Sequence, residues 1–366
     1  MNDTLLDPLP PNEDLESRDI LLQLAKAHRH LAELKGAVKS IPNESILINT
    51  LSLQEAKDSS AVENIVTTHD ELYRAVSGDE SVDPATKEVQ RYARALKEGF
   101  FYVSENSLIP NSLLMKIQDI LEPNKPGFRK LPGTALKNRS TGEVIYTPPQ
   151  NYHDIVRYMS DLERFTNDDS LSSLDPLIKM ALIHYQLESI HPFYDGNGRT
   201  GRIVNVLYLV AKGLMDIPVL YLSRFIIQNR SDYYRLIQAV RDDSGWEAWV
   251  IFILTAISHT SRQTLLLVDQ IRELMLQAKH RMRSELPNIY SQDLLNNLFR
   301  HPYTKIAFVM ADLNTSRPTA SRYLDKLAET GFVQKEKFGR DNYYLNTPLI
   351  DLLHDIPDLS EQGYPS

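Results

Sequence analysis

Apolar residues recur at steps of three and four over most of the first 285 positions, and this spacing limits the possible fold more than any other feature. Residues 19–39 show it clearly, with Leu22, Leu24, Ala27, Leu31 and Leu34 on one helical face. The same period predicts further helices at 44–57, 59–76, 84–103, 110–122, 151–166, 175–190, from Arg199 through "TGRIVNVLYLVAKGL", and at 221–228, 230–242, 245–262 and 264–285. We therefore expect a mainly α-helical body.

One segment of this helical body has a different pattern. "ALKNRSTGEVIYTPP" alternates around a glycine-containing turn and ends in two prolines, which predicts a short β-hairpin at 137–147 with an exposed edge. An extended peptide can add to such an edge as a further strand. A plain surface hairpin without a binding role is the alternative.

The chain changes character near residue 287. Short helical segments at 291–299, 303–311 and 316–330 precede a strand–turn–strand pattern in "FVQKEKFGRDNYYLN". This order predicts a winged helix-turn-helix in 288–366. Its third helix carries Arg317, Arg322 and Lys326, so a DNA-binding regulator is an alternative function. Residues 300–351 hold eight Lys and Arg against six Asp and Glu, and this small excess favours a protein-interaction or dimer-supporting role instead.

Composition and charge exclude several classes of function. The chain has 366 residues, a formal net charge of −8 and no cysteine. The charge argues against a general binder of nucleic acid or anionic membranes, and the absence of cysteine excludes disulfides, thiolate metal sites and thiol catalysis. "MNDTLLDPLPPNEDLE" lacks the basic and apolar regions of a signal peptide, and the apolar run at 249–257 is too short to cross a bilayer. We expect a cytoplasmic protein with no membrane partner.

The stretch "HPFYDGNGRTGR" at 191–202 carries the chemistry of a phosphate site. Gly196, Asn197 and Gly198 precede a predicted helix, so that backbone N–H groups and the helix N-terminus can converge on an anion. Arg199 and Arg202 can bind further phosphates of a polyphosphate chain. Asp195 offers an oxygen ligand of the kind that Mg²⁺ accepts. The set favours a nucleoside triphosphate over a monophosphate.

A histidine at the end of the preceding helix supplies a base for this site. The neutral imidazole of His191 can take a proton from an incoming hydroxyl near neutral pH, which gives group transfer with pyrophosphate leaving. Phe193 is expected to anchor the loop in the core. Taken singly, a capping histidine, a Gly-x-Gly and a solvated arginine pair would all be unremarkable, but their joint occurrence in twelve positions favours the phosphate site.

The same twelve residues match the signature of Fic-domain proteins, HPFx[D/E]GNGRxxR, position for position. The resemblance extends over about residues 45–285, through "SLQEAKDSSAVENIVTTHDELY" and "YLSRFIIQNRSDYYRLIQAVR". It divides the chain into an N-terminal extension with the first helix (1–44), a Fic-type region (45–287) and the winged-helix-like region (288–366).

The resemblance implies transfer of AMP from ATP to Ser, Thr or Tyr hydroxyls of a target protein. It assigns His191 as the base, Asp195 to Mg²⁺ and Gly196–Gly198 to the anion hole. Arg199 and Arg202 would hold the outer phosphates, and Thr200 and Gly201 complete the ATP-binding motif. A phosphorylating branch of the family carries Ala and Lys in this turn, and the present sequence does not.

A second motif, "SSAVEN" at 59–64, matches the inhibitory pattern [S/T]xxxE[G/N] of the same family. On a helix Ser59 and Glu63 share a face, and a surface capping serine with an exposed glutamate is the alternative interpretation. The resemblance assigns Ser59, Glu63 and Asn64 to an inhibitory helix at 59–76, in which Glu63 pairs with Arg202 and occupies the place of the γ-phosphate.

Further expectations concern the partners, the adenine of ATP and the net activity. The resemblance makes the hairpin at 137–147 a flap on which the target protein docks, and a homodimer is the expected assembly. Asn229, Tyr233 and Tyr234 offer an amide and aromatic faces suited to adenine, although helical tyrosines also serve as packing residues. Removal of AMP from a target is the alternative net activity.

Overall fold

The computed structural model describes residues 6–76, 83–124, 127–137, 141–338 and 341–355. The tip of the predicted hairpin (138–140), the turn of the predicted wing (339–340) and the end of the predicted C-terminal region (356–366) lie outside the described residues. The expected mainly helical architecture is confirmed. Its helices are α1 (Arg18–Val38), α2 (Glu44–Val62), α3 (His69–Val76), α4 (Pro84–Asn106), α5 (Asn111–Leu121), α6 (Tyr152–Asn167), α7 (Pro176–Ile190), α8 (Asn197–Ala211), α9 (Leu222–Gln228), α10 (Arg230–Asp243), α11 (Trp246–Glu285), α12 (Gln292–Arg300), α13 (Ile306–Leu313), α14 (Arg317–Glu329) and α15 (Thr347–His354), with a short 3₁₀ turn at Asp169–Leu171.

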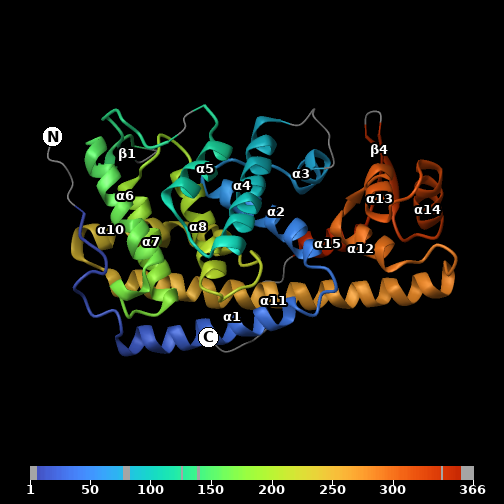
Figure 1. Ribbon diagram of the computed structural model, residues 1–366, viewed down its shortest axis with the longest axis horizontal. Helices are drawn as coiled ribbons and strands as arrows, with labels where there is room; N and C mark the ends of the chain where they lie inside the picture. Colours follow the sequence, from blue (N-terminus) through green and yellow to red (C-terminus); the bar gives the residue numbers. More distant parts are fainter. Residues whose placement is uncertain (1–5, 77–82, 125–126, 138–140, 339–340, 356–366) are drawn as a thin grey trace.

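A single long helix, α11, extends along the molecule, with α1 packed beside it (Figure 1). We predicted two helices at 245–262 and 264–285, and this was wrong. Between them "TSRQT" contains neither proline nor glycine, and Thr260 satisfies its hydroxyl within the helix by donating to the Ala256 carbonyl. By length and composition alone this one described helix could cross a bilayer, but 56% of its most apolar window is buried inside the protein. That burial is typical of a core helix.

The helix α2 also differs from the prediction. We predicted a break after residue 57 and an inhibitory helix at 59–76, whereas α2 continues to Val62 and the chain leaves the helix only at residues 63–68. Ser59 and Ser60 suggested a new N-terminus, but both are fully buried in the last turn of α2. Burial of α2 on nearly all sides therefore overrides the capping preference of its serines.

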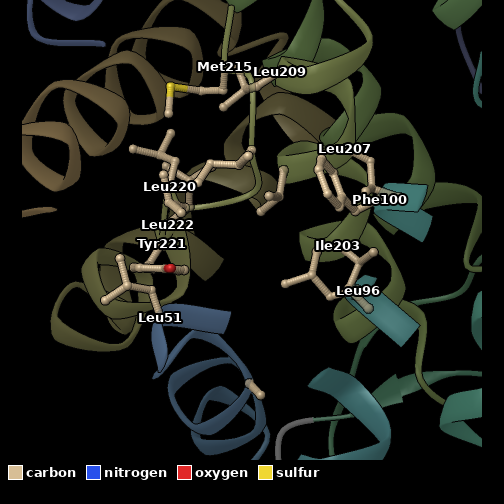
Figure 2. Packing of buried hydrophobic residues seen from close by; sticks show 14 of the residues in the cluster. Leu51, Leu96, Phe100, Ile203, Leu207, Leu209, Met215, Leu220, Tyr221 and Leu222 are labelled. Atoms are coloured by element: carbon tan, nitrogen blue, oxygen red, sulfur yellow. The ribbon is translucent and has the colours of Figure 1, made fainter. Parts of the chain in front are cut away.

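The helix α8 packs against α4, α7, α5 and α2, and Figure 2 shows the part of this core that α2, α4 and the segment leading into α9 contribute. Leu96 and Phe100 of α4 pack against Ile203 and Leu207 of α8. The two helices approach closely at Gly99, where an added Cβ would lie 2.6 Å from Leu207 Cδ1. Each large apolar side chain buried here stabilises the fold by about 1.5–3 kcal/mol, so that the start of α8 is held on a rigid base.

The predicted hairpin is present as the antiparallel strands β1 (Leu136–Lys137) and β2 (Val144–Tyr146), with Leu136 opposite Tyr146. On the β2 side the Tyr146 hydroxyl donates to the Ser189 carbonyl of α7 at 2.9 Å. Val144 and Ile145 are about half exposed. The hairpin therefore stands on the end of α7 and presents apolar side chains outward.

The C-terminal region combines α12, α13 and α14 with a three-stranded antiparallel sheet of order β3-β5-β4, which is consistent with the predicted winged helix-turn-helix. The strands are β3 (Tyr303–Thr304), β4 (Gln334–Phe338) and β5 (Asp341–Leu345). The helix predicted at 303–311 instead begins at Ile306, because Tyr303 and Thr304 pair with β5.

This C-terminal region packs against α2 and α3. Gln54 of α2 donates to the Leu353 carbonyl of α15 at 3.1 Å, and the rings of Tyr73 and Tyr303 stack at 5.4 Å. The Tyr303 hydroxyl also donates to Asp70 at the start of α3. The contacts therefore lie on either side of the turn that follows α2.

Candidate active site

The loop between α7 and α8 is shaped by two left-handed residues and one asparagine. His191 ends α7 with φ 48° and its N–H bonds the Leu187 carbonyl, while Gly196 precedes α8 with φ 77°. Asn197 accepts from Phe193 N at 2.8 Å and donates to Phe193 O at 2.9 Å. Its side chain therefore closes the loop through two hydrogen bonds to the Phe193 backbone. The helix begins at Asn197, two residues earlier than predicted, and Phe193 is fully buried as expected.

His191 lies at the junction of α7 and this loop with its Nδ1 enclosed by protein. Burial lowers the pKa of His191 to about 4, and the Arg129 guanidinium lowers it further, while the backbone carbonyl of Glu188 raises it. Nδ1 does not reach full hydrogen-bond geometry with that carbonyl. The imidazole is neutral at pH 7, as a proton acceptor must be.

Asp195 provides the oxygen donors at the mouth of the loop. Its side chain is 47% exposed, and Oδ1 accepts from Gly196 N at 2.8 Å. One exposed carboxylate beside a helix N-terminus fits Mg²⁺ completed by phosphate oxygens and water. Within the described ranges no group of three or more His, Cys, Asp or Glu side chains could hold a metal ion by itself. A metal here would therefore need the nucleotide as a ligand.

Arg202 is held by the end of α2. Its Nη2 donates to Glu63 Oε1 at 2.9 Å and to the Ser59 carbonyl at 3.0 Å, and its Nε donates to Ser59 Oγ at 2.7 Å. The Arg202 side chain is 2% exposed and that of Glu63 23%. Burial opposes the charge of Arg202, but Glu63 and its other partners outweigh it and raise the arginine's pKa. The sequence-predicted trio of Ser59, Glu63 and Arg202 is thus assembled in one place.

The structure explains why the two motifs carry glycine at position 198 and asparagine at position 64. A Cβ at Gly198 would lie 2.7 Å from Glu63 Oε1 and 2.9 Å from Arg202 Nη1, so that only glycine allows the ion pair to pass so close to the backbone. Asn64 adopts φ 65°, a left-handed conformation that asparagine and glycine tolerate best. Its Oδ1 also accepts from Arg230 Nη1 at 2.9 Å.

Arg199 is surrounded by carboxylates, two of which the sequence analysis missed. Glu63 Oε2 lies 3.3 Å from its Nε, Glu88 Oε2 3.3 Å from Nη1, and Glu122 Oε1 2.7 Å from Nη2. Glu88 belongs to α4 and Glu122 follows α5, so no local sequence pattern connects them with the loop. In this state both arginines of the motif are neutralised by protein rather than available to phosphates.

The remaining predicted site residues face the interior or lie on α9 and α10. Thr200 and Gly201 are buried in the first turn of α8, where Gly201 lies beside His184 and Glu188. The Tyr233 hydroxyl pairs with His184 Nε2 at 2.9 Å and the ring is 2% exposed, so it packs in the core. Tyr234 is half exposed, and Asn229 donates to the Phe225 carbonyl. Of the three residues suggested for adenine, only Tyr234 therefore exposes its ring, and the Arg230 guanidinium lies over that ring at 5.8 Å from its centroid.

Two buried carboxyl groups near the arginines had no sequence signal. Glu55 of α2 is fully buried and accepts from Tyr92 Oη at 3.0 Å and from Ser223 Oγ. Burial raises the pKa of Glu55 to about 8. Glu188 has an enclosed Oε1, and burial raises its pKa to about 7 although Arg202 acts in the opposite direction. Both carboxyl groups are buried close enough to Arg202 for its charge to act on their pKa.

Comparison with family models covers most of the chain. Residues 21–101 match the Fic/DOC family N-terminal model and residues 109–209 match the Fic/DOC family model. Residues 274–349 match the model described as protein adenylyltransferase SoFic-like, C-terminal domain. The second match contains the loop and the first contains Ser59, Glu63 and Asn64.

Individual relatives resemble parts of the chain. Protein adenylyltransferase fic-1 of Caenorhabditis elegans is 31% identical over 123 residues, which are 33% of this chain and 23% of that protein. Protein adenylyltransferase Fic of Drosophila erecta is 35% identical over 140 residues, or 37% and 27%. The matched segments thus span about a quarter of the curated relatives.

Solved structures share the fold over a longer stretch. A Fic family protein from Desulfovibrio desulfuricans superposes with a TM-score of 0.57 at 20% identity, covering 93% of this chain and 98% of the other. Residues 134–508 of Fic-1 from Caenorhabditis elegans superpose with a TM-score of 0.51 at 18% identity, covering 71% and 73%.

Proposed function

Because this chain belongs to the Fic/DOC family, we propose that it is a protein adenylyltransferase that is held inactive by Glu63. The observation that carries the proposal is the position of the neutral His191 beside a loop whose helix N-terminus and two arginines converge. These groups suit a base and a triphosphate, respectively.

In the proposed reaction an acceptor Ser, Thr or Tyr hydroxyl attacks the α-phosphorus of ATP. The new bond joins the acceptor oxygen to the α-phosphorus, the bond to the β-phosphate bridging oxygen breaks, and pyrophosphate leaves. His191 accepts the hydroxyl proton. The N–H groups at Gly196–Gly198 hold phosphate oxygens, and Arg199 and Arg202 bind the outer phosphates once the carboxylates release them. Mg²⁺ bound at Asp195 would neutralise the charge that develops on the leaving phosphates.

The proposed inhibition follows from charge competition at the arginines. Glu63 contributes one oxygen to each arginine, at 2.9 Å from Arg202 and 3.3 Å from Arg199. A γ-phosphate needs the same donors, so ATP must displace a carboxylate that is already in place. The family's alternative activity, removal of AMP, would instead require Glu63. The two activities therefore predict opposite effects of Glu63→Gly.

The experiment that tests this function uses ATP labelled at different phosphates. The Glu63→Gly variant is incubated with Mg²⁺ and either α-labelled or γ-labelled ATP, and its own Ser, Thr and Tyr residues and those of added extract are mapped by mass spectrometry. Adenylylation predicts incorporation from the α-position only, and loss of incorporation in Glu63→Gly/His191→Ala. Incorporation from the γ-position would indicate phosphorylation and reject the proposal.

The hairpin is the proposed docking site for the acceptor protein. Leu131, Val144 and Ile145 expose 69%, 51% and 49% of their surface around it, and β1 and β2 pair only with each other in a two-stranded sheet, which leaves an edge for an added strand. A homodimer and a cytoplasmic location stay predictions, and light scattering of the purified chain measures the first of them directly.

DNA binding by the C-terminal region has less support. On and beside α14, Lys326 pairs with Glu329 at 3.0 Å and Lys335 pairs with Asp325 at 2.6 Å. These pairs offset two of the positive charges that phosphates would require. Retention of the C-terminal region on nonspecific DNA at low salt would revive this alternative.

A further inference from the structure

Arg129, which belongs to neither motif, has its whole side chain buried next to the active-site loop, with 0% exposure. Its Nε donates to the His191 carbonyl at 2.9 Å, and its Nη2 donates to the Ile190 carbonyl at 3.4 Å and to the Pro149 carbonyl. Its Nη1 has no hydrogen-bond partner within the described residues. The guanidinium is therefore surrounded by carbonyl oxygens rather than by a carboxylate.

Such an arrangement is unfavourable for stability alone. A buried charge without a counter-ion loses its hydration, and burial lowers the pKa of Arg129 accordingly. The carbonyls of Ile190 and His191 belong to the end of α7, where helical carbonyls have no partner within the helix. A neutral donor or water would satisfy them at lower cost. The arginine is better explained by a role beyond stability, because its length and several donors allow it to connect separate backbone segments.

The three carbonyls belong to the two parts of the site that must meet. Pro149 follows β2 at the base of the hairpin, and His191 carries the base. The backbone N–H of Arg129 also donates to the Pro192 carbonyl at 2.8 Å. Next to it, the Tyr194 hydroxyl accepts from Lys130 N at 2.9 Å and from Leu131 N at 3.2 Å. Residues 129–131 are thus fastened to the active-site loop on both sides.

We propose that Arg129 is a positioning residue that fixes the acceptor-docking hairpin and the base His191 in one relative geometry. The proposal rests on the proposed function, since it needs an acceptor on the hairpin and a base at His191. An acceptor hydroxyl brought by the hairpin then arrives within reach of the imidazole, and a small misplacement would lower the rate strongly. The guanidinium also opposes protonation of His191, which keeps the ring competent as a base.

The test compares Arg129→Met, Arg129→Lys and the control Arg272→Met in the Glu63→Gly background. Arg272 lies on α11 in an exposed ion pair with Asp269, so its removal changes the charge by the same amount elsewhere. The readouts are the dissociation constant of ATP, the rate of AMP transfer, the pH dependence of that rate and the melting temperature by circular dichroism.

We expect Arg129→Met to lower transfer by roughly tenfold to a hundredfold with ATP affinity within about twofold, because geometry and not donor binding is lost. The acidic limb of its pH profile should move up by roughly one unit, since a cation near the imidazole is gone. Arg129→Lys should keep the acidic limb in place and recover only part of the rate. A rate that falls only in proportion to ATP affinity or to the folded fraction in both variants would overturn the positioning role.

A readout without turnover separates this proposal from the proposed function. Hydrogen exchange of the Lys130 and Leu131 amides and an NMR titration of the His191 ring need only the folded resting protein. Arg129→Met should speed exchange at both amides and raise the pKa of His191, whereas Arg272→Met should change neither. Unchanged exchange and an unchanged titration would reject the role of Arg129. Absent transfer in Glu63→Gly with Arg129 intact would instead reject the proposed function.

Discussion

Replacing Glu63 with glycine should convert the resting protein into an active one. The change removes the carboxylate that contacts Arg202 at 2.9 Å and Arg199 at 3.3 Å. Glu63 is the C-cap residue that follows α2, with φ −96° and ψ 10°, so that glycine fits its backbone without strain. The loss is expected to be local, because the Glu63 side chain is part of no apolar cluster.

The size of the effect follows from the two contacts. A hydrogen bond to a charged group contributes about 1.5–3 kcal/mol. The Arg202 contact alone, taken at the low end, corresponds to a gain of roughly tenfold in transfer, and both contacts together to about a hundredfold. Ser59 still holds Arg202 through its hydroxyl and carbonyl, which keeps the expected gain below the upper figure.

The assay measures incorporation of α-labelled AMP with ATP and Mg²⁺ at equal protein concentrations. Glu63→Gln keeps the size of the side chain but not its charge, so it should be intermediate. Glu63→Gly combined with Arg202→Ala should be inactive, because the freed arginine is then missing. Incorporation that stays flat or drops in Glu63→Gly would refute the inhibitory assignment and favour a role of Glu63 in AMP removal.

Three further outcomes follow from neighbouring groups. Asp195→Ala should abolish the Mg²⁺ dependence of ATP binding measured by calorimetry, since it removes the exposed carboxylate at the loop, and retained dependence would contradict the ligand assignment. Glu122→Gln removes a charge 2.7 Å from Arg199 and should strengthen ATP binding severalfold in the Glu63→Gly background; unchanged affinity would show that Arg199 is not a phosphate ligand. Burial raises the pKa of Glu55 to about 8, so its contribution to stability is complete below about pH 4.5 and is lost as the pH rises towards 8. Urea unfolding should therefore show a larger destabilisation by Glu55→Gln at pH 5 than at pH 8, and equal values would exclude a buried neutral carboxyl.

The sequence was sufficient for features encoded within a short stretch. The loop at 191–202 and the segment Ser59–Asn64 each carry their chemistry in consecutive residues, and the family resemblance of the two motifs implied the pairing of Glu63 with Arg202 that the structure contains. The C-terminal boundary of α2 could not be predicted from the sequence, because Ser59 and Ser60 near its end are buried by tertiary packing and do not cap a new helix. Local propensity is overridden in such places.

Residues that converge from distant helices left no signal. Glu88, Glu122 and Arg129 reach the loop from α4, from the end of α5 and from the segment before the hairpin, and each is an ordinary charged residue in its own neighbourhood. The Arg199 surroundings and the link between hairpin and base therefore depend on helix packing that a single sequence does not reveal.

The contacts between α15 and the helices α2 and α3 change how fragments of this protein have to be interpreted. Gln54 donates to the Leu353 carbonyl, and the ring centroids of His69 and His354 lie 4.4 Å apart. The helix α15 therefore contacts the chain on both sides of Glu63. A fragment that stops before residue 347 would lack α15 and would lose these contacts with α2 and α3. The basal activity of such a fragment would then reflect a weaker hold of Glu63 on the arginines. Inhibition should therefore be measured on a chain that includes α15.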